Sequence, residues 1–151
     1  PDVLDWLEQI APVKATGRIF GYRDVLSMEC QGDARVALAH ILELEGHTIG
    51  VMNNLELRSM SDEIRPGAIG AQILPNQSLP SMVEQVFGTS VDIVVFGRTL
   101  EAMVEEHDGI LFVNPGSPTI PRNLMKLGQV AILDLTSESR EARIIDLTTL
   151  V

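Results

Sequence analysis

The sequence has a single cysteine, Cys30, among its 151 residues. One cysteine excludes an internal disulfide and also a Cys-x-x-Cys zinc or redox motif. No apolar run approaches the roughly 20 residues that a membrane-spanning helix needs, and no charged-then-apolar signal segment opens the sequence. We therefore expect a cytoplasmic protein that does not associate with membranes.

Basic residues are also scarce. Eleven Lys and Arg stand against 21 Asp and Glu, which gives a formal charge of −10. This charge repels phosphate backbones, so we expect no nucleic-acid partner. With 45% apolar residues, the length suits one domain over residues 1–151 that buries a core without disulfides or a structural metal.

Periodicity and turn residues predict a sequence of short elements. Apolar residues at helical spacing indicate two helices, and alternating or continuous apolar runs bounded by Gly, Pro, Asn and Asp indicate strands. The expected elements are a helix over Asp2–Ile10, an extended piece at Val13–Thr16, a loop containing Gly17, Gly21 and Gly32, a hairpin of Ala37–Glu45 and Thr48–Met52 turning at Gly46-His47, a helix over Leu79–Phe87, a buried strand from Val91 to Phe96, a hairpin of Ala102–His107 and Ile110–Val113 around Asp108-Gly109, and strands at Gln129–Leu135 and Ala142–Leu147.

A helix followed by a wholly apolar strand, mixed with hairpins, predicts a layered α/β domain with a mixed sheet. Between the first hairpin and the second helix lies a long connection, Asn53 to Ser78, that is rich in apolar residues. Two interpretations of it stay open: a segment that docks a partner or covers a site, and an ordered loop packed on its own domain.

The segment from Asp92 to Arg122 reads DIVVFGRTLEAMVEEHDGILFVNPGSPTIPR. It resembles the small YfcE-type members of the calcineurin-like phosphoesterases, in which a buried strand leads into Gly-His-Thr-His, a hairpin and Asn-Pro-Gly-Ser. The upstream order of helix, Ala11-Pro12-Val13, Leu42–Gly46 and Ile49–Val51 is similar too. The resemblance implies a sandwich of mixed β-sheets flanked by helices, and we expect the family's opening strand and N-terminal part to be absent. The loss of that strand would expose a sheet edge.

In active members of this family, two metal ions (manganese, zinc or iron) bind the phosphate ester and activate water. The family's ligand positions are changed in this sequence. Arg98 and Leu100 replace the histidines of Gly-His-Thr-His, Asn53 and Leu55 occupy a Thr-His-Gly-His motif, and Arg18 and Phe20 occupy a Gly-Asn-x-Asp motif. Arginine and leucine side chains offer a metal no ligand atom, so we expect no bound metal and no other cofactor.

Five residues around these positions are candidate ligand-binding groups: Asn53, Asn54, Arg98, Thr99 and Asn114. Arg98 either anchors a phosphate or carboxylate group or forms a salt bridge with a nearby acidic residue, and the salt bridge is the favoured reading. The turn that starts at Asn114 either contacts a ligand or only specifies the backbone. His40, His47 and His107 lack helical metal-ligand spacing and are expected in surface or cross-strand roles.

The lost ligands favour a non-catalytic binding or scaffold protein, similar to the small retromer subunit, which the resemblance places in the same fold. Its partner would be a protein or a small anionic ligand. An exposed sheet edge also predicts a homo-oligomer. The alternative is an active metal-dependent phosphodiesterase or phosphatase with unusual ligands, and a further one is metal-free anion binding around Arg98 and Asn114. Fold resemblance alone does not decide between them.

Overall fold

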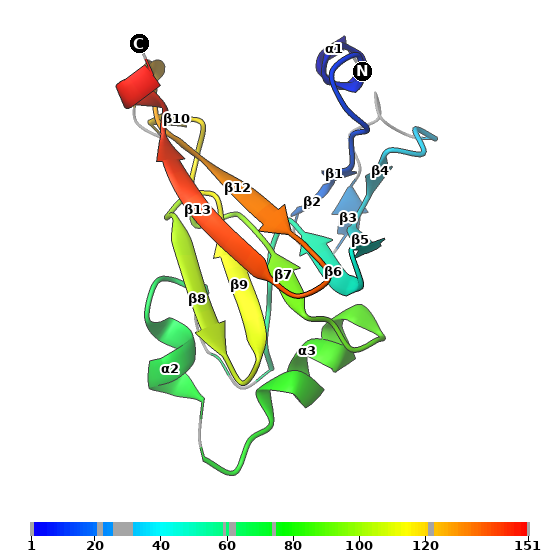
Figure 1. Cartoon of the computed structure of the whole chain (residues 1–151), viewed down its shortest axis with the longest axis vertical. Coiled ribbons are helices and arrows are strands. Elements are labelled where there is room, and N and C mark those ends of the chain that lie inside the picture. The colour runs from blue at the N-terminus through cyan, green and yellow to red at the C-terminus, as the bar shows by residue number, and fades with distance from the viewer. Residues whose placement is uncertain are drawn as a thin grey trace.

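The computed structural model describes residues 2–20, 23–25, 32–58, 60, 63–73, 75–120 and 123–150. A mixed five-stranded sheet with the order β5-β6-β7-β9-β8 forms its centre (Figure 1). The inner pairs, β6 with β7 and β7 with β9, are parallel, and the outer pairs are antiparallel. The strands are β5 (Ala39–Leu44), β6 (His47–Met52), β7 (Ile93–Val95), β8 (Met103–His107) and β9 (Ile110–Asn114). This arrangement confirms the expected α/β class.

Tight turns close the two hairpins of this sheet. The φ angles are +51° and +82° at Glu45 and Gly46, and +49° and +76° at Asp108 and Gly109. Positive φ at both central residues is typical of the turns whose twist matches that of paired strands. The second turn lies where the sequence predicts it. The first was predicted one residue too late, because His47 already pairs with Leu44 as the first residue of β6.

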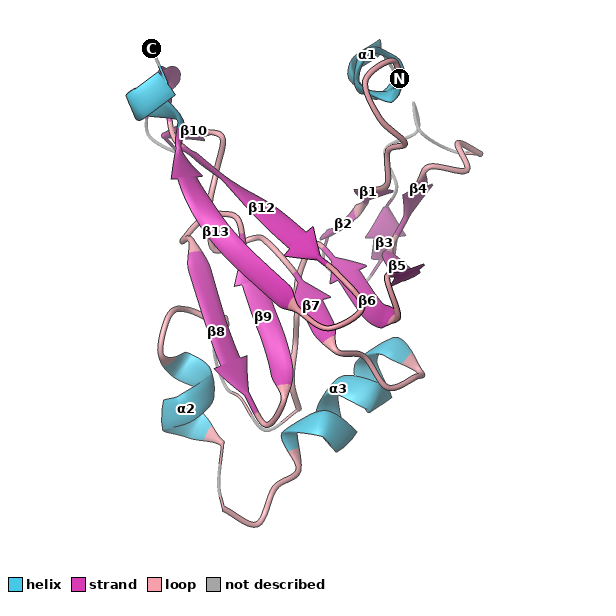
Figure 2. Ribbon diagram, in the orientation of Figure 1, coloured by secondary structure: helices cyan, strands magenta, loops and turns pink. Residues whose placement is uncertain are grey.

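Helices and a hairpin cover opposite faces of the sheet. Helices α2 (Ala68–Gln72) and α3 (Leu79–Phe87) lie against one face, and the hairpin of β12 (Gln129–Leu135) and β13 (Arg140–Asp146) covers the other (Figure 2). Along β7, Val94 packs in the cluster with the helices, and Ile93 packs in the cluster with the hairpin. Both side chains are fully buried, so the apolar run is covered on both faces as predicted.

Helix α3 has the predicted bounds because both of its ends carry strong local signals. The hydroxyl of Ser78 accepts a hydrogen bond from the backbone N–H of Ser81, and Pro80 lies in the first turn. Gly88 ends the helix with φ +75°, a left-handed conformation that glycine adopts without steric cost. Near its end, Phe87 packs directly over Gly50 of β6, where an added Cβ would lie 2.6 Å from the ring.

The long connection after β6 is packed on its own domain. Its side chains Leu55, Leu57, Ile64 and Ile69 are at most 2% exposed and belong to the core shared with α3. No helix was predicted in this connection, but it contains α2, a five-residue helix too short to produce a clear periodic pattern. Of the two interpretations, the ordered loop is therefore the one that these residues support.

The N-terminal region forms small elements beside the main sheet. Helix α1 (Asp2–Glu8) ends two residues before the predicted Ile10, and none of its residues is buried. The predicted extended piece is a strand only in its last two residues, β1 (Ala15–Thr16), which pairs in parallel with β4 (Val36–Ala37). The stretch predicted as a loop contains the short hairpin β2 (Arg18–Phe20) and β3 (Arg23–Val25), strands of three residues that leave no period in the sequence.

The C-terminal strands largely follow the prediction. β12 has the expected bounds, whereas β13 starts two residues before the predicted Ala142 because Arg140 pairs with Leu135. Two strands that were not predicted, β10 (Thr119–Ile120) and β11 (Asn123–Leu127), precede them, and a 3-10 turn, η2 (Leu147–Leu150), follows. Among the described residues, none of the helices has the length and apolar character needed to cross a bilayer.

In the described part of the chain, the five strands are contiguous, so β5 and β8 are the edges of the sheet. Whether an opening strand is missing and whether another chain pairs with an edge both stay predictions.

Candidate functional site

Two loops meet where the parallel strands β6 and β7 end. β6 ends at Met52 and β7 ends at Val95, and parallel pairing brings these carboxyl ends to the same edge of the sheet. Beyond them, the backbone N–H of Gly97 donates a 3.0 Å hydrogen bond to the carbonyl oxygen of Asn53. Segments 53–55 and 97–100, which the sequence marks as separate motifs, are therefore neighbours. Binding sites of α/β sheets commonly form at such strand ends.

The second of these loops has an uncommon backbone. Arg98 has φ +69° and Leu100 has φ +60°, although neither is glycine. A left-handed conformation costs a residue with a side chain about 1–2 kcal/mol. Residues held in such conformations cluster at binding and catalytic sites, where the surrounding structure enforces them. The backbone of this loop therefore makes it a candidate binding segment independently of any motif.

Asn114, the last residue of β9, holds this loop in place through side-chain hydrogen bonds. Its side chain is fully buried, and its Nδ2 donates hydrogen bonds to the carbonyl oxygen of Gly97 at 3.2 Å and to Oγ1 of Thr99 at 2.9 Å. Its Oδ1 accepts the backbone N–H of Gly116 at 3.0 Å. Both amide hydrogens are therefore used inside the protein, and Asn114 acts by positioning the 97–100 loop.

A chain of alternating charges runs across the site. The Nε of Arg98 donates a 2.9 Å hydrogen bond to Oε1 of Glu63, which is the salt bridge expected for Arg98. Glu63 also lies 3.5 Å from Nη2 of Arg65, and Arg65 pairs in turn with Glu101. These side chains are 40–53% exposed, so water screens the pairs and each contributes at most about 1 kcal/mol to stability. Their main effect is to join the loop after β7 to the segment before α2.

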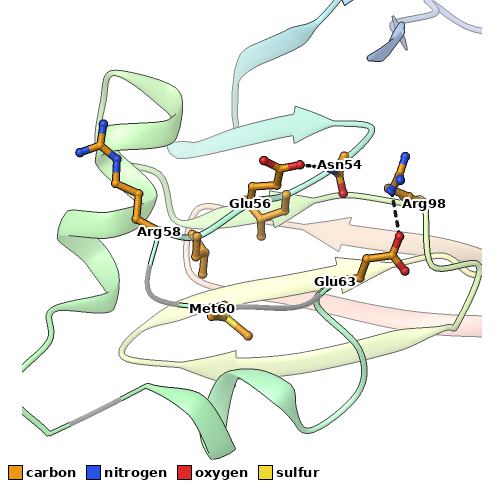
Figure 3. A pocket seen from close by; sticks show the side chains of 8 residues that line it. Asn54, Glu56, Arg58, Met60, Glu63 and Arg98 are labelled. Atoms are coloured by element: carbon orange, nitrogen blue, oxygen red, sulfur yellow. Dashed lines mark hydrogen bonds and ion pairs between the residues drawn. The ribbon is translucent and has the colours of Figure 1, made fainter. Parts of the chain in front are cut away.

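A pocket of about 440 Å³ opens beside this ion pair (Figure 3). Two polar contacts join its lining residues: Asn54 donates a 2.6 Å hydrogen bond to Glu56, and Arg98 donates one to Glu63. Of the lining residues that the structure describes, two are arginines and two are glutamates. The lining residues are Asn54, Leu55, Glu56, Leu57, Arg58, Met60, Glu63 and Arg98.

The predicted site residues separate into three groups. Asn53, Asn54, Arg98 and Thr99 lie together at the strand ends, with Asn114 buried beneath them. Leu55 is 2% exposed and part of the core, whereas Leu100 is 46% exposed and lines a different pocket. Arg18 and Phe20 lie in β2, and their side chains fall outside the described part of the structure.

Three charged residues of the pocket were not predicted: Glu56, Arg58 and Glu63. Glu63 lies 35 residues from Arg98 in the sequence, and no short motif joins the two. The excess of acidic residues predicted that Arg98 would have an acidic partner, but it did not indicate which one.

The three histidines are on separate strands and share no site. His40 contacts the carbonyl oxygen of Ala15 at 2.8 Å, and His47 contacts that of Thr136 at 2.9 Å. The Nε2 of His107 lies 2.8 Å from Oε2 of Glu105. These are the surface and cross-strand roles expected for them.

The side chains described at this site do not fit a dimetal centre. Such a centre needs carboxylate, imidazole or amide groups that reach both ions. Here a guanidinium cation lies at one expected position and leucines lie at two, while Asn53 and Thr99 supply only neutral oxygens. Within the described ranges, no three His, Cys, Asp or Glu side chains are grouped so that they could hold a metal ion.

Comparison with known proteins identifies the family. Residues 1–138 match the model of the calcineurin-like phosphoesterase superfamily domain. A probable metallophosphoesterase of Methanocaldococcus jannaschii is 26% identical over 145 residues, which cover 95% of this chain but only 59% of that protein. The chain thus spans less than two thirds of that relative.

Two solved structures show the same fold. The structure of an archaeal phosphodiesterase gives a TM-score of 0.55 at 18% identity, covering 96% of this chain and 75% of that one. The solution structure of a Thermotoga maritima protein gives a TM-score of 0.52 at 20% identity. This match covers 96% of this chain and 73% of that protein's chain. Sequence and fold agree, and this chain belongs to the calcineurin-like phosphoesterase superfamily.

Proposed function

We propose that this protein is a non-catalytic member of its superfamily that has lost the dimetal centre and binds a ligand at the pocket beside Arg98. The ligand is a partner protein or a small molecule with an anionic group.

The observation that carries this proposal is the Arg98–Glu63 ion pair at the end of β7. Its guanidinium group occupies a position where the family resemblance implies an imidazole ligand. A permanent cation within a few ångströms of a divalent ion repels it, and a guanidinium group has no lone pair to offer. Leu55, at another position where the resemblance implies a metal ligand, is a buried core residue.

Arg98 also supports an anionic ligand. Only its Nε has a partner among the described residues, so the Nη groups of this pocket-lining guanidinium are available to a ligand. A planar guanidinium binds phosphate or carboxylate groups through two parallel hydrogen bonds. Arg98 would then supply, as one fixed cation, part of the positive charge that metal ions supply in active members of the family.

The test measures metal retention and hydrolysis on the same sample. The protein is incubated with manganese and zinc, desalted and analysed by elemental mass spectrometry. Its hydrolysis of bis-p-nitrophenyl phosphate is then followed with and without a chelator. We expect no retained metal and no chelator-sensitive turnover. Retention of about two metal ions per chain together with chelator-sensitive hydrolysis would contradict the proposal.

Anion binding is tested separately, by the thermal unfolding midpoint in increasing inorganic phosphate. A ligand that binds only the folded state raises this midpoint. We expect phosphate to stabilise the wild type more than Arg98→Gln, with or without chelator. Arg143→Gln is the matched control, because Arg143 is also an exposed arginine paired with a carboxylate, Asp134 at 3.3 Å, but lies outside the pocket. Equal responses of all three proteins would count against an anion site at Arg98.

A further inference from the structure

A second pocket, of about 250 Å³, lies between the β10–β11 hairpin and the end of β13. It shares no lining residue with the pocket beside Arg98, but the 97–100 loop contributes to both: Arg98 lines the first and Leu100 lines the second. The proposed function does not involve this second pocket.

Backbone contacts build the walls of this pocket. The N–H of Gly128 donates to the carbonyl oxygen of Pro118 at 2.9 Å, and its own carbonyl oxygen accepts the N–H of Leu147 at 2.9 Å. A Cβ at Gly128 would lie 2.3 Å from the carbonyl oxygen of Ser117, so only glycine permits this approach. Main-chain hydrogen bonds therefore hold together the backbone segments that line this pocket.

The lining combines apolar side chains with one carboxylate. Leu100, Ile120 and Leu127 are 40–46% exposed, which leaves a partly open apolar surface. Of the lining residues within 75–120 and 123–150, Asp146 is the only ionisable one. Its Oδ1 accepts hydrogen bonds from the hydroxyl of Thr148 at 2.6 Å and from the N–H of Thr148 at 2.9 Å, which lower the pKa of this carboxyl group. Its Oδ2 has no donor among the described residues.

We propose that this pocket receives a lysine or arginine side chain of a partner protein, with the alkyl part against Leu100, Ile120 and Leu127 and the cationic group at Oδ2 of Asp146. Long basic side chains carry both chemistries on one stem. An anionic group would be repelled by Asp146, and a purely apolar group would remove that carboxylate from water without a partner. The charge of −10 attracts basic partners over longer distances.

The experiment uses blocked tripeptides, acetyl-Gly-Lys-Gly-amide and the same peptide with norleucine in place of lysine. Each is titrated into the isotope-labelled protein while the amide signals of Leu100, Gly128 and Thr148 are followed by NMR. We expect the lysine peptide to shift these signals with millimolar affinity, because one side chain buries little surface. The norleucine peptide, which lacks only the charge, should bind several-fold more weakly.

Three variants identify the atoms involved. Asp146→Asn should weaken the lysine peptide by up to about fivefold, the range of an exposed ion pair, and keeps an oxygen for Thr148. Glu141→Gln removes the same charge from an exposed residue of the same strand that lines neither pocket, so its affinity should equal that of the wild type. Leu100→Asn should weaken both peptides while retaining a residue that accepts positive φ.

The proposal is overturned if both peptides bind equally well, or if Asp146→Asn and Glu141→Gln reduce the affinity alike, which would indicate diffuse attraction to an acidic protein. It is also overturned if the lysine peptide shifts none of the three amide signals.

Discussion

Asn114 donates a 2.9 Å hydrogen bond to the hydroxyl of Thr99, and this bond joins two turns that are 15 residues apart in the sequence. Substitution Asn114→Ala removes this bond and two others, leaving buried polar groups without partners. We expect the free energy of unfolding, measured in urea, to fall by about 2–3 kcal/mol. Thr99→Val, which loses a single partner, should cost about 1 kcal/mol. The exposed Asn76→Ala is the control, and a similar loss there would contradict the role of Asn114.

The contact between Gly50 and Phe87 predicts a steric cost. In Gly50→Ala the new methyl group meets the ring at 2.6 Å, and such overpacking should destabilise the protein by roughly 1–3 kcal/mol. Combining it with Phe87→Leu should cost less than the sum of the two single changes, since the clash disappears. Gly70→Ala in α2 is the matched control. Its Cβ would lie 3.4 Å from His107, an ordinary contact, so it should be neutral or stabilising.

The positive φ of Arg98 predicts that substitution by glycine is better tolerated than substitution by alanine. Arg98→Ala loses the ion pair with Glu63 but keeps φ +69°, so it should destabilise the protein by less than about 1 kcal/mol. Arg98→Gly loses the same pair but relieves a backbone strain of about 1–2 kcal/mol. We therefore expect Arg98→Gly to be at least as stable as the wild type and more stable than Arg98→Ala. Thermal unfolding of the three proteins checks this, and the reverse order of the two variants would show that the backbone is not strained.

Asp33 predicts a loss of stability in acid. Hydrogen bonds from the side chain of Arg35, and then from its backbone N–H, lower the pKa of Asp33 from 3.8 to about 2. A lowered pKa means that the folded state prefers the ionised carboxylate. The contribution is therefore complete above about pH 4 and is lost as the pH falls toward 2.

The advantage of the wild type over Asp33→Asn in urea unfolding should thus be larger near about pH 5 than near about pH 2.5. Asp134→Asn, which removes an exposed carboxylate with one 3.3 Å contact, is the comparison and should show a smaller change. A constant difference between wild type and Asp33→Asn at the two pH values would refute the assignment.

Strong local signals explain which elements the sequence predicts. Helix α3 carries Ser78, Pro80 and Gly88 at its ends, and the β8–β9 hairpin turns at Asp108-Gly109, so short stretches of sequence are sufficient to place them. Helix α2 and the β2–β3 pair are too short for a periodic pattern. The early start of β13 depends on distant groups, because the side chain of Arg140 donates to the carbonyl oxygens of Asp92 and Gly109.

The residues of the candidate site likewise divide into those that a short motif predicts and those that only the tertiary fold brings in. Arg98, Asn53 and Asn114 were found because each lies in a short motif, and the parallel strands then bring them together. Glu63 and Asp146 belong to no motif and reach their pockets only through the tertiary fold. Leu55 was marked by its position in a motif, but its side chain is an ordinary core residue, in keeping with its apolar chemistry.

The 97–100 loop has a thermodynamic consequence because Arg98 faces one pocket and Leu100 faces the other. A ligand that moves the loop at one pocket changes the shape of the second through only two intervening peptide bonds. Linkage makes such an effect reciprocal: if an anion at Arg98 alters the affinity for a basic side chain at Asp146, that side chain alters the affinity for the anion by the same factor. Residues 97–100 would then couple ligand binding at the two pockets.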